Sequence, residues 1–387
     1  MVSPSEAIRI ILSHAKPLAV ESIQLSKAVG RVLREDIKSD RDQPPFDKCL
    51  LDGIAISFEA WQKGIRQFNV QAIVPPGIAA KPLKNSSYCL RVMTGAVLPK
   101  GCHCVIPIDQ IDLEGNIAEI KDWTIVKKNQ NIRFQAADGK RGKVLLKHGC
   151  QLLAPHIATA AIVGKSTFKV SALPKIAMIA TGDELVDISK PIKQYQTRLS
   201  NSYALQALFH QAKLGDVQIF HAPDNEQVIF NCIKEVLGKF DVVILSGGLS
   251  MGAFDYVPKV LAKVGIKKLF HKVSQRPGKP FWFGTAQRGK PVFALPGNPV
   301  SAQICAFRYI VPFLKKASGL DVKQEFVEVA ENINIQSDLT QFLPVLAGKL
   351  VVVGGLGDFA SLAQADGFIE YDSHKNQHRW PYFSWRV

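Results

Sequence analysis

The chain has 387 residues, of which 47% are hydrophobic, and it carries a formal net charge of +15. That length exceeds what one hydrophobic core organises, so about two to four domains are expected. No apolar run reaches the roughly 18 to 20 residues that a membrane-spanning helix needs, and the positive charge predicts anionic partners without saying which.

The first residues predict a helix. Ser3, Pro4 and Glu6 form a capping box with proline at the first helical position, before an apolar run of helical period. This start is unlike a secretory signal, and seven cysteines without framework spacing favour reduced thiols, so we expect a cytoplasmic protein. A second amphipathic stretch at Ile23–Leu33 extends the helical prediction. Residues 1–40 together with 140–170 are interpreted as an N-terminal helical and linker domain.

Residues 41–139 are predicted to form a β-rich domain. Their apolar runs are short and separated by glycine and proline, as in Tyr88–Met93 and Cys104–Ile108. A helix is expected afterwards at Pro155–Val163. The full chain is therefore a multidomain protein of mixed α+β and α/β character.

Residues 171–317 predict a central α/β domain. Apolar runs alternate with helical patterns, which indicates a parallel sheet covered by helices on both faces. The expected strands are Ile176–Ala180, Val217–Phe220, Val242–Leu245 and Val292–Leu295, and the expected helices are Asn201–Ala212, Asn225–Leu237, Tyr256–Val264 and Val300–Lys315. Residues 318–387 predict a small C-terminal β domain, with strands at Phe326–Val329, Leu350–Val353 and Phe368–Tyr371.

Ligands of an open parallel sheet bind outside the carboxyl ends of its strands, so the loops there are the candidates for function. The loop Ser246–Gly252 contains Gly247, Gly248 and Gly252 and precedes a helix. Glycines let the backbone approach a ligand, and a helix start presents unpaired N–H groups to an anion. A plain tight turn is an equally good interpretation of this loop alone.

Basic residues surround a second segment. Lys272, Arg276 and Lys279 lie in or near Arg276–Pro280, where two prolines restrict the backbone and hold cations at the same sheet edge. Such cations suit a multiply charged substrate. A solvated basic turn is the alternative.

Carboxylates follow the strands as well. Asp183, Glu184, Asp224 and Asp255 would repel a phosphate unless a cation such as Mg²⁺ lies between them. Asp224 and Asp255 could instead be helix N-caps.

Three further patterns are weaker. Cys102-His103-Cys104 lacks a second pair at zinc-site spacing and favours a core or loop. The residues from Gly248 to Gly252 spell a hydrolase elbow without its oxyanion motif, and Gly284–Lys290 has P-loop spacing but ends before a proline. We therefore expect neither a serine hydrolase nor a Walker-type ATPase.

Several blocks, taken together and in order, resemble one family. They are Pro44–Asp47 with Asp52–Gly53, Arg91–Ala96, Thr181–Leu185, Ser246–Gly248 with Asp255–Tyr256, Arg276–Pro280 and Leu295–Ser301. Over about residues 1–315 the chain resembles the bacterial molybdopterin molybdenumtransferases, whose relatives include a domain of gephyrin. Lys48, Cys49, Arg276 and Pro344 depart from residues frequent in that family.

The resemblance implies a reaction in which adenylyl-molybdopterin and molybdate give molybdenum cofactor and AMP, assisted by Mg²⁺. It implies a homodimer with its active site between subunits, and possible contacts with the molybdopterin adenylyltransferase and recipient molybdoenzymes. The implied catalytic residues are Asp52, Thr94, Asp138, Glu184, Asp224, Asp255, Lys272 and Arg276; the substrate-binding residues are Ser246, Gly247, Gly248, Ser250, Gly252, Lys279, Pro296, Gly297, Asn298 and Pro299; the metal ligands are Asp255, Asp224 and Glu184.

Alternatives remain open at this point. A molybdopterin adenylyltransferase would share the α/β module, and a molybdopterin-binding scaffold would use the fold without catalysis. A nucleic-acid-binding protein is suggested only by charge, because no basic face with interleaved aromatic residues is visible. We expect neither nucleic acid nor membrane as a partner, and the choice between molybdate and tungstate is open.

Overall fold

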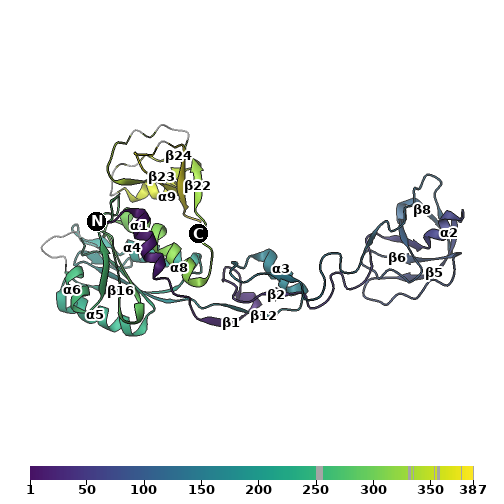
Figure 1. The fold of residues 1–387 in the computed structure, drawn as a ribbon, viewed down its shortest axis with the longest axis horizontal. Coiled ribbons are helices and arrows are strands. Elements are labelled where there is room, and N and C mark those ends of the chain that lie inside the picture. The colour runs from purple at the N-terminus through teal and green to yellow at the C-terminus, as the bar shows by residue number, and fades with distance from the viewer. Residues whose placement is uncertain are drawn as a thin grey trace. The chain divides into compact units, whose positions relative to one another are not determined.

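The computed structural model describes residues 1–249, 256–329, 333, 335–352, 354, 358–375 and 377–386. The chain divides into two compact units (Figure 1). The first contains Met1–Glu35, His148–Ala154 and Thr167–Val387, and the second contains Asp36–Lys147 and Pro155–Ser166. Parts of the expected N-terminal domain thus fall in both units, and the four finer domain ranges remain predictions.

A six-stranded sheet forms the centre of the first unit. Its order is β16 (Asp216–Ala222), β13 (Lys175–Thr181), β17 (Val242–Ser246), β21 (Pro291–Leu295), β20 (Trp282–Thr285) and β18 (Lys267–His271). The first four strands are parallel, as expected.

The last two strands make this sheet mixed rather than purely parallel. Strand β20 pairs antiparallel with β21 and β18 pairs antiparallel with β20. Only residues 286–290 connect β20 to β21, and so short a connection joins antiparallel strands, whereas parallel strands need a crossover. The P-loop spacing at Gly284–Lys290 is therefore a hairpin.

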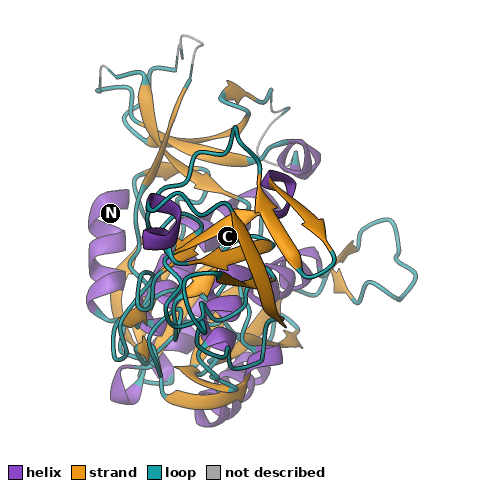
Figure 2. Ribbon diagram, turned by 90° about the vertical axis from the view of Figure 1, so that its right-hand side faces the viewer, coloured by secondary structure: helices purple, strands orange, loops and turns teal. Residues whose placement is uncertain are grey.

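Helices cover both faces of the sheet (Figures 1 and 2). On one side lie α1 (Pro4–Ser13), α4 (Ser200–Gln211), α7 (Pro299–Cys305), the π-helical η4 (Ala306–Ile310) and α8 (Val311–Ser318); on the other lie α5 (Glu226–Lys239) and α6 (Val257–Lys263). Met178 packs into the first cluster and its neighbour Ala177 into the second. The alternation follows from the two-residue period of a strand and confirms that both faces are buried.

The expected helix at Ile23–Leu33 is wrong. Residues Val20–Gln24 form strand β1, which pairs antiparallel with β12 (Thr167–Ser171), and a short 3-10 turn η1 (Leu25–Lys27) follows. Pairing with a distant strand has overridden a local pattern that was compatible with a helix. The first helix is confirmed, because the Ser3 hydroxyl accepts the Glu6 N–H at 3.1 Å.

The second unit is rich in strands, as expected. Its main sheet has the order β7 (Cys104–Pro107), β4 (Gly53–Ile56), β6 (Tyr88–Val92), β5 (Gln67–Val74), β9 (Ile117–Ile120) and β8 (Ile111–Glu114). Smaller elements are β2 (Ile37–Lys38), β3 (Lys48–Cys49), β10 (Ile132–Arg133), β11 (Val144–Leu146), α2 (Phe58–Gln62) and η2 (Ile108–Gln110). The expected helix near Pro155 is α3 (Ala154–Ile162).

The C-terminal residues build a second sheet of the first unit. Its order is β19 (Gln275–Arg276), β23 (Thr340–Leu346), β25 (Gly367–Tyr371), β26 (Arg379–Ser384) and β22 (Glu325–Glu328), with β24 (Lys349–Leu350) beside β23 and helix α9 (Phe359–Gln364). The expected strands Phe326–Val329 and Phe368–Tyr371 correspond to β22 and β25. Of the expected strand Leu350–Val353 only Leu350 lies in a strand, because β24 ends there; Val353 is outside the described residues. Strand β19 comes from the α/β sequence, so the C-terminal sheet reaches the segment that begins at Gln275.

Among the described residues, none of the helices combines the length and the apolar character that a membrane crossing requires.

Candidate active site

A cleft of about 730 Å³ lies at the carboxyl end of the parallel strands. Segments that follow β13, β17 and β21 meet in it, together with the start of α4 and the segment around Arg276. The sequence-predicted residues that line it are Glu184, Asp224, Ser246, Gly247, Gly248, Arg276, Lys279, Pro296, Gly297, Asn298 and Pro299. Residues more than 100 positions apart are thereby brought to one place.

Asn201, in the first turn of α4, joins two of these loops. Its Nδ2 donates to Ser246 Oγ and to the Gly297 carbonyl oxygen, both at 2.9 Å. Asn298 in turn caps α7, because its Oδ1 accepts the Ser301 N–H at 3.0 Å. The loops after β17 and β21 are thus held by side-chain hydrogen bonds, which favours a fixed binding surface.

The diglycine in the loop after β17 is required by close packing. Gly247 has φ of 102° and Gly248 has φ of 64°. A Cβ at Gly247 would collide with the Thr181 carbonyl oxygen, and one at Gly248 would lie 2.7 Å from a Val257 methyl carbon. Ser250, Gly252 and Asp255, which were also predicted here, lie outside the described residues.

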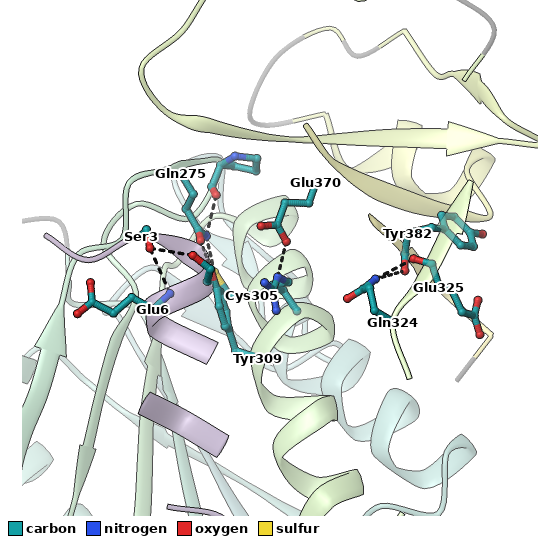
Figure 3. A network of polar contacts seen from close by, with 12 residues as sticks. Ser3, Glu6, Gln275, Cys305, Tyr309, Gln324, Glu325, Glu370 and Tyr382 are labelled. Carbon is teal, nitrogen blue, oxygen red and sulfur yellow. Dashed lines mark hydrogen bonds and ion pairs between the residues drawn. The ribbon is translucent and has the colours of Figure 1, made fainter. Parts of the chain in front are cut away.

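A buried network that includes Gln275, Cys305 and Tyr309 supports the segment Arg276–Pro280; Figure 3 shows these three side chains close together. Gln275 is fully buried; its Nε2 donates to the Pro277 carbonyl oxygen at 3.1 Å, and its Oε1 accepts the Tyr309 hydroxyl. Gly278 has φ of 92°, and a Cβ there would lie 2.6 Å from Cys305 Sγ. The backbone that carries Arg276 and Lys279 is therefore packed against the helix that contains Tyr309.

A buried ion pair connects the same helix to the C-terminal sheet. Arg308 Nε lies 2.7 Å from Glu370 Oε2, and the two side chains are only 9% and 17% exposed (Figure 3). Strand β23 adds a second connection, because Gln275 and Arg276 pair with Thr340 and Gln341. The C-terminal sheet thus supports one wall of the cleft.

The cations divide into two groups. Arg276 and Lys279 line the cleft, and so does Arg198, which the sequence did not single out. Lys272 is not among the described residues that line it; its N–H donates to the Phe281 carbonyl oxygen at 3.0 Å.

Carboxylates face the same space. Glu184 and Asp224 line the cleft, and Asp183 Oδ1 accepts the Asp224 backbone N–H at 3.0 Å. The N-cap of α5 is Asn225, so the expectation that Asp224 could be that cap is wrong. Within the described ranges, no group of three or more His, Cys, Asp and Glu side chains is placed to hold a metal ion.

Three predicted residues belong to the second unit. Asp52 Oδ1 accepts the Thr94 backbone N–H at 2.6 Å and its hydroxyl at 2.7 Å. These hydrogen bonds hold the pKa of the Asp52 carboxyl below its ordinary value. Asp138 forms an exposed ion pair with Arg133.

Asn201, Ser200 and Arg198 were missed as lining residues. The helix Asn201–Ala212 was predicted, and the start of a helix that follows a parallel strand belongs at the carboxyl end of the sheet. The long segment between Thr181 and Ser200 separates this helix from its strand in sequence, and no glycine or charge marks Asn201.

The other sequence patterns have structural explanations. Cys102 and Cys104 are buried in the second unit, and burial raises the pKa of the Cys104 thiol to about 12. These cysteines are core residues, as favoured above. Pro344, at a departure from the family pattern, is buried in β23 and pairs with Phe368; it is not among the described residues that line the cleft.

The α/β sheet and its polar cleft define the chain as a multidomain protein built around an α/β domain with a cleft at the carboxyl ends of its parallel strands. A model of the MoeA N-terminal region (domain I and II) matches residues 2–164, and a model of a probable molybdopterin binding domain matches residues 177–316. The molybdopterin molybdenumtransferase of a Synechocystis strain is 33% identical, with 100% of both chains covered. The corresponding protein of Staphylococcus aureus strain Mu50 is 32% identical over 93% of this chain and 89% of its own length.

Solved structures agree with these relatives. The molybdopterin biosynthesis moeA protein of Pyrococcus horikoshii OT3 has a TM-score of 0.83 and 26% identity, covering 99% of this chain and 98% of that one. The chain belongs to the molybdopterin molybdenumtransferase family. Its role lies in the biosynthesis of the molybdenum cofactor.

Proposed function

We propose that this chain transfers molybdenum from molybdate to adenylyl-molybdopterin and releases AMP. The observation that carries the proposal is the cleft, in which Arg276 and Lys279 face the same space as the Gly247–Gly248 turn. Guanidinium and ammonium groups neutralise a diphosphate, and glycine lets backbone N–H groups come close to it. The family relationship supplies the identity of the substrate.

The cleft residues have distinct parts in this proposal. Arg276 and Lys279 hold the phosphates, while the ties made by Asn201 keep the loops after β17 and β21 in place. Positioned charges stabilise the negative charge that develops as a P–O bond of the phosphoanhydride is cleaved. The two dithiolene sulfurs replace two oxygens of molybdate. The equivalent of one of these oxygens is added to phosphorus as the anhydride is cleaved and AMP leaves, and the other is released as water after taking up protons.

The two carboxylates that face the cleft would bind a divalent cation jointly with the phosphates of the substrate. Glu184 and Asp224 supply oxygen donors, which Mg²⁺ prefers, and the family pattern adds Asp255. Bound there, Mg²⁺ would neutralise the diphosphate and polarise the bond to be cleaved. In this proposal the cations of the cleft balance the charge of the diphosphate, and the carboxylates balance the charge of the metal ion.

AMP release is the direct test. Adenylyl-molybdopterin is incubated with the protein, with and without molybdate, and with EDTA followed by added Mg²⁺. We expect AMP only in the presence of molybdate and Mg²⁺. Asp224→Asn should lose most of this release. Asp216→Asn, at the start of the strand that precedes Asp224 and outside the cleft lining, should retain it. Release that is independent of molybdate would contradict the proposal.

The same assay separates the other functions. An adenylyltransferase would make adenylyl-molybdopterin from ATP and molybdopterin, whereas a scaffold would bind molybdopterin and release nothing. We expect neither outcome, because the Synechocystis relative, which matches this chain over its full length, is named a molybdopterin molybdenumtransferase.

We infer in addition that two copies assemble and that Asp52 and Thr94 of one copy act with the cleft of the other. This inference rests on the family pattern and on the orientation of the Asp52 carboxylate, which is fixed by two hydrogen bonds from Thr94. Mixing the weakly active Asp52→Asn and Asp224→Asn variants in equal amounts should raise the activity to about a quarter of the wild-type value, because each mixed dimer regains one intact site. No restoration in a mixture shown by native mass spectrometry to contain mixed dimers would contradict a shared site.

A further inference from the structure

Three polar side-chain atoms around the cleft are buried and have no hydrogen-bond partner among the described residues. They are Thr181 Oγ1, Asn201 Oδ1 and Ser202 Oγ, and all three residues line the cleft. Buried polar atoms in folded proteins are nearly always paired. Their clustering at one cleft points to a ligand as the missing partner.

Asn201 carries the most specific information, because the orientation of its amide is determined. Nδ2 donates to the Gly297 carbonyl oxygen and to Ser246 Oγ. A carbonyl oxygen can only accept, so the amide nitrogen must face Gly297 and cannot exchange places with the oxygen. Oδ1 is therefore a fixed acceptor. The Thr181 and Ser202 hydroxyls can rotate and either donate or accept.

A fixed acceptor selects for a particular kind of ligand atom. The oxygens of an ionised diphosphate are also acceptors, so they cannot pair with Asn201 Oδ1. Arg276 and Lys279 are the groups in this cleft that suit the phosphates. The partner of Asn201 must carry an N–H or an O–H group, and an adenylylated pterin offers N–H groups on the pterin and hydroxyl groups on the ribose.

We propose that Asn201 Oδ1 accepts a hydrogen bond from a neutral N–H or O–H group of the substrate and so determines which ligand the cleft accepts. The proposal rests on the function proposed above for this cleft. A ligand that lacks the donor would leave a buried acceptor unpaired, and sites built in this way discriminate strongly against such analogues. Asn201 thus binds a neutral group of the substrate, while the cations bind its charged phosphates.

Fragment binding tests this role. Calorimetry measures the affinity of wild type and Asn201→Ala for adenylyl-molybdopterin, for molybdopterin and for AMP. We expect binding of adenylyl-molybdopterin to weaken about 10- to 100-fold. We also expect only one fragment to weaken: molybdopterin if the donor is on the pterin, or AMP if it is on the ribose.

Gln206→Ala is the matched control. Gln206 lies on the same helix, and its Nε2 also donates to a strand carbonyl, that of Val217 at 3.0 Å, but it does not line the cleft. Its loss should leave all three affinities unchanged. If Asn201→Ala does not unfold in one cooperative transition, Asn201→Ser replaces it in the same measurements.

Three results would overturn the proposal: unchanged affinities in the Asn201 variant, equal weakening of both fragments, or the same loss in the Gln206 variant. AMP release by the wild type is followed in parallel. Absence of release would refute the proposed function, whereas the fragment affinities test Asn201 by themselves.

Discussion

The two units of the chain hold their candidate residues in different ways. In the first unit, the residues that face the cleft are carried by loops tied to each other through Asn201 and through the buried Gln275. In the second unit, Asp52, Thr94 and Asp138 are exposed and are held by one or two local contacts. The contrast indicates a preformed binding surface in one unit and individually oriented polar groups in the other. Changes in the first should therefore alter binding, and changes in the second should alter turnover.

The largest effect is expected at Gly247. A side chain in Gly247→Ala would meet the Thr181 carbonyl oxygen, and its positive φ disfavours any residue with a Cβ, so the loop must move. Displacement of about 1 Å in a positioned site can cost about 100-fold in rate. We expect at least that loss of AMP release.

Gly238→Ala is its control, because a Cβ at Gly238 would meet nothing within 4 Å. Measured release in the two variants sharpens the claim that the cleft is preformed. Near-normal release by Gly247→Ala would break it.

A smaller effect is expected from Asp52→Asn. It removes the negative charge of a residue that is not among the described residues lining the cleft, so kcat for AMP release should fall about 10- to 100-fold, within the range of a positioned acid or base. Calorimetric AMP affinity should stay within about twofold, because the cations hold the phosphate. Parallel loss of affinity and kcat would contradict the division of roles between the units.

Removal of the Tyr309 hydroxyl tests whether the buried network around Gln275 fixes the backbone of Arg276. Tyr309→Phe leaves the Gln275 Oε1 acceptor buried and unpaired, which should lower the free energy of unfolding by about 1 to 3 kcal/mol. The KM for adenylyl-molybdopterin should rise severalfold because Arg276 loses its fixed backbone.

Tyr382→Phe provides the comparison. Its hydroxyl donates to Asp366 in the C-terminal sheet, away from the residues that line the cleft, so stability should fall while KM stays unchanged. Equal KM values in the two tyrosine variants would contradict the role of Gln275 in positioning Arg276.

The smallest effect concerns the Asp52 carboxyl itself. Its pKa is lowered by the backbone and hydroxyl donors of Thr94, so Thr94→Val should move it back toward the ordinary value of 3.8. Because the pKa is lower in the folded protein, the ionised carboxyl stabilises the fold at pH values above the ordinary pKa. This contribution is lost as the pH falls through the lowered pKa. Carboxyl titration by NMR checks the shift. Ser189→Ala, which removes a donor from Asp187 instead, should leave Asp52 unchanged.

Local patterns predicted the parts of the fold that depend on local periodicity. The four parallel strands and the helices between them follow from apolar runs that must be buried on both faces. Strands β18 and β23 were missed, because Lys267–His271 and Thr340–Leu346 carry mixed residues whose strand character depends on their partners. The error at Ile23–Leu33 has the same origin, since β1 exists through its pairing with β12.

The residues of the candidate site also divide into those that a local pattern predicts and those that depend on tertiary contacts. Gly247, Arg276 and Glu184 were predicted as site residues because their loops are rich in glycine and charged residues, and all three line the cleft. Asn201 and Gln275 were not predicted, since an isolated amide has no sequence signature. Their importance arises from burial and from partners 34 or more residues away. Tertiary contacts, rather than motifs, select these residues.

The central claim is that fixed cations in the cleft hold the phosphates of the substrate. Calorimetric binding of adenylyl-molybdopterin to the double variant Arg276→Ala/Lys279→Ala tests it most directly, with Arg9→Ala/Lys239→Ala as an equally charged control from exposed helix faces. We predict at least about 100-fold weaker binding for the cleft pair, because two charge-assisted hydrogen bonds are lost, and no change for the control. Unchanged affinity in the cleft pair, or an equal loss in both pairs, would contradict the account.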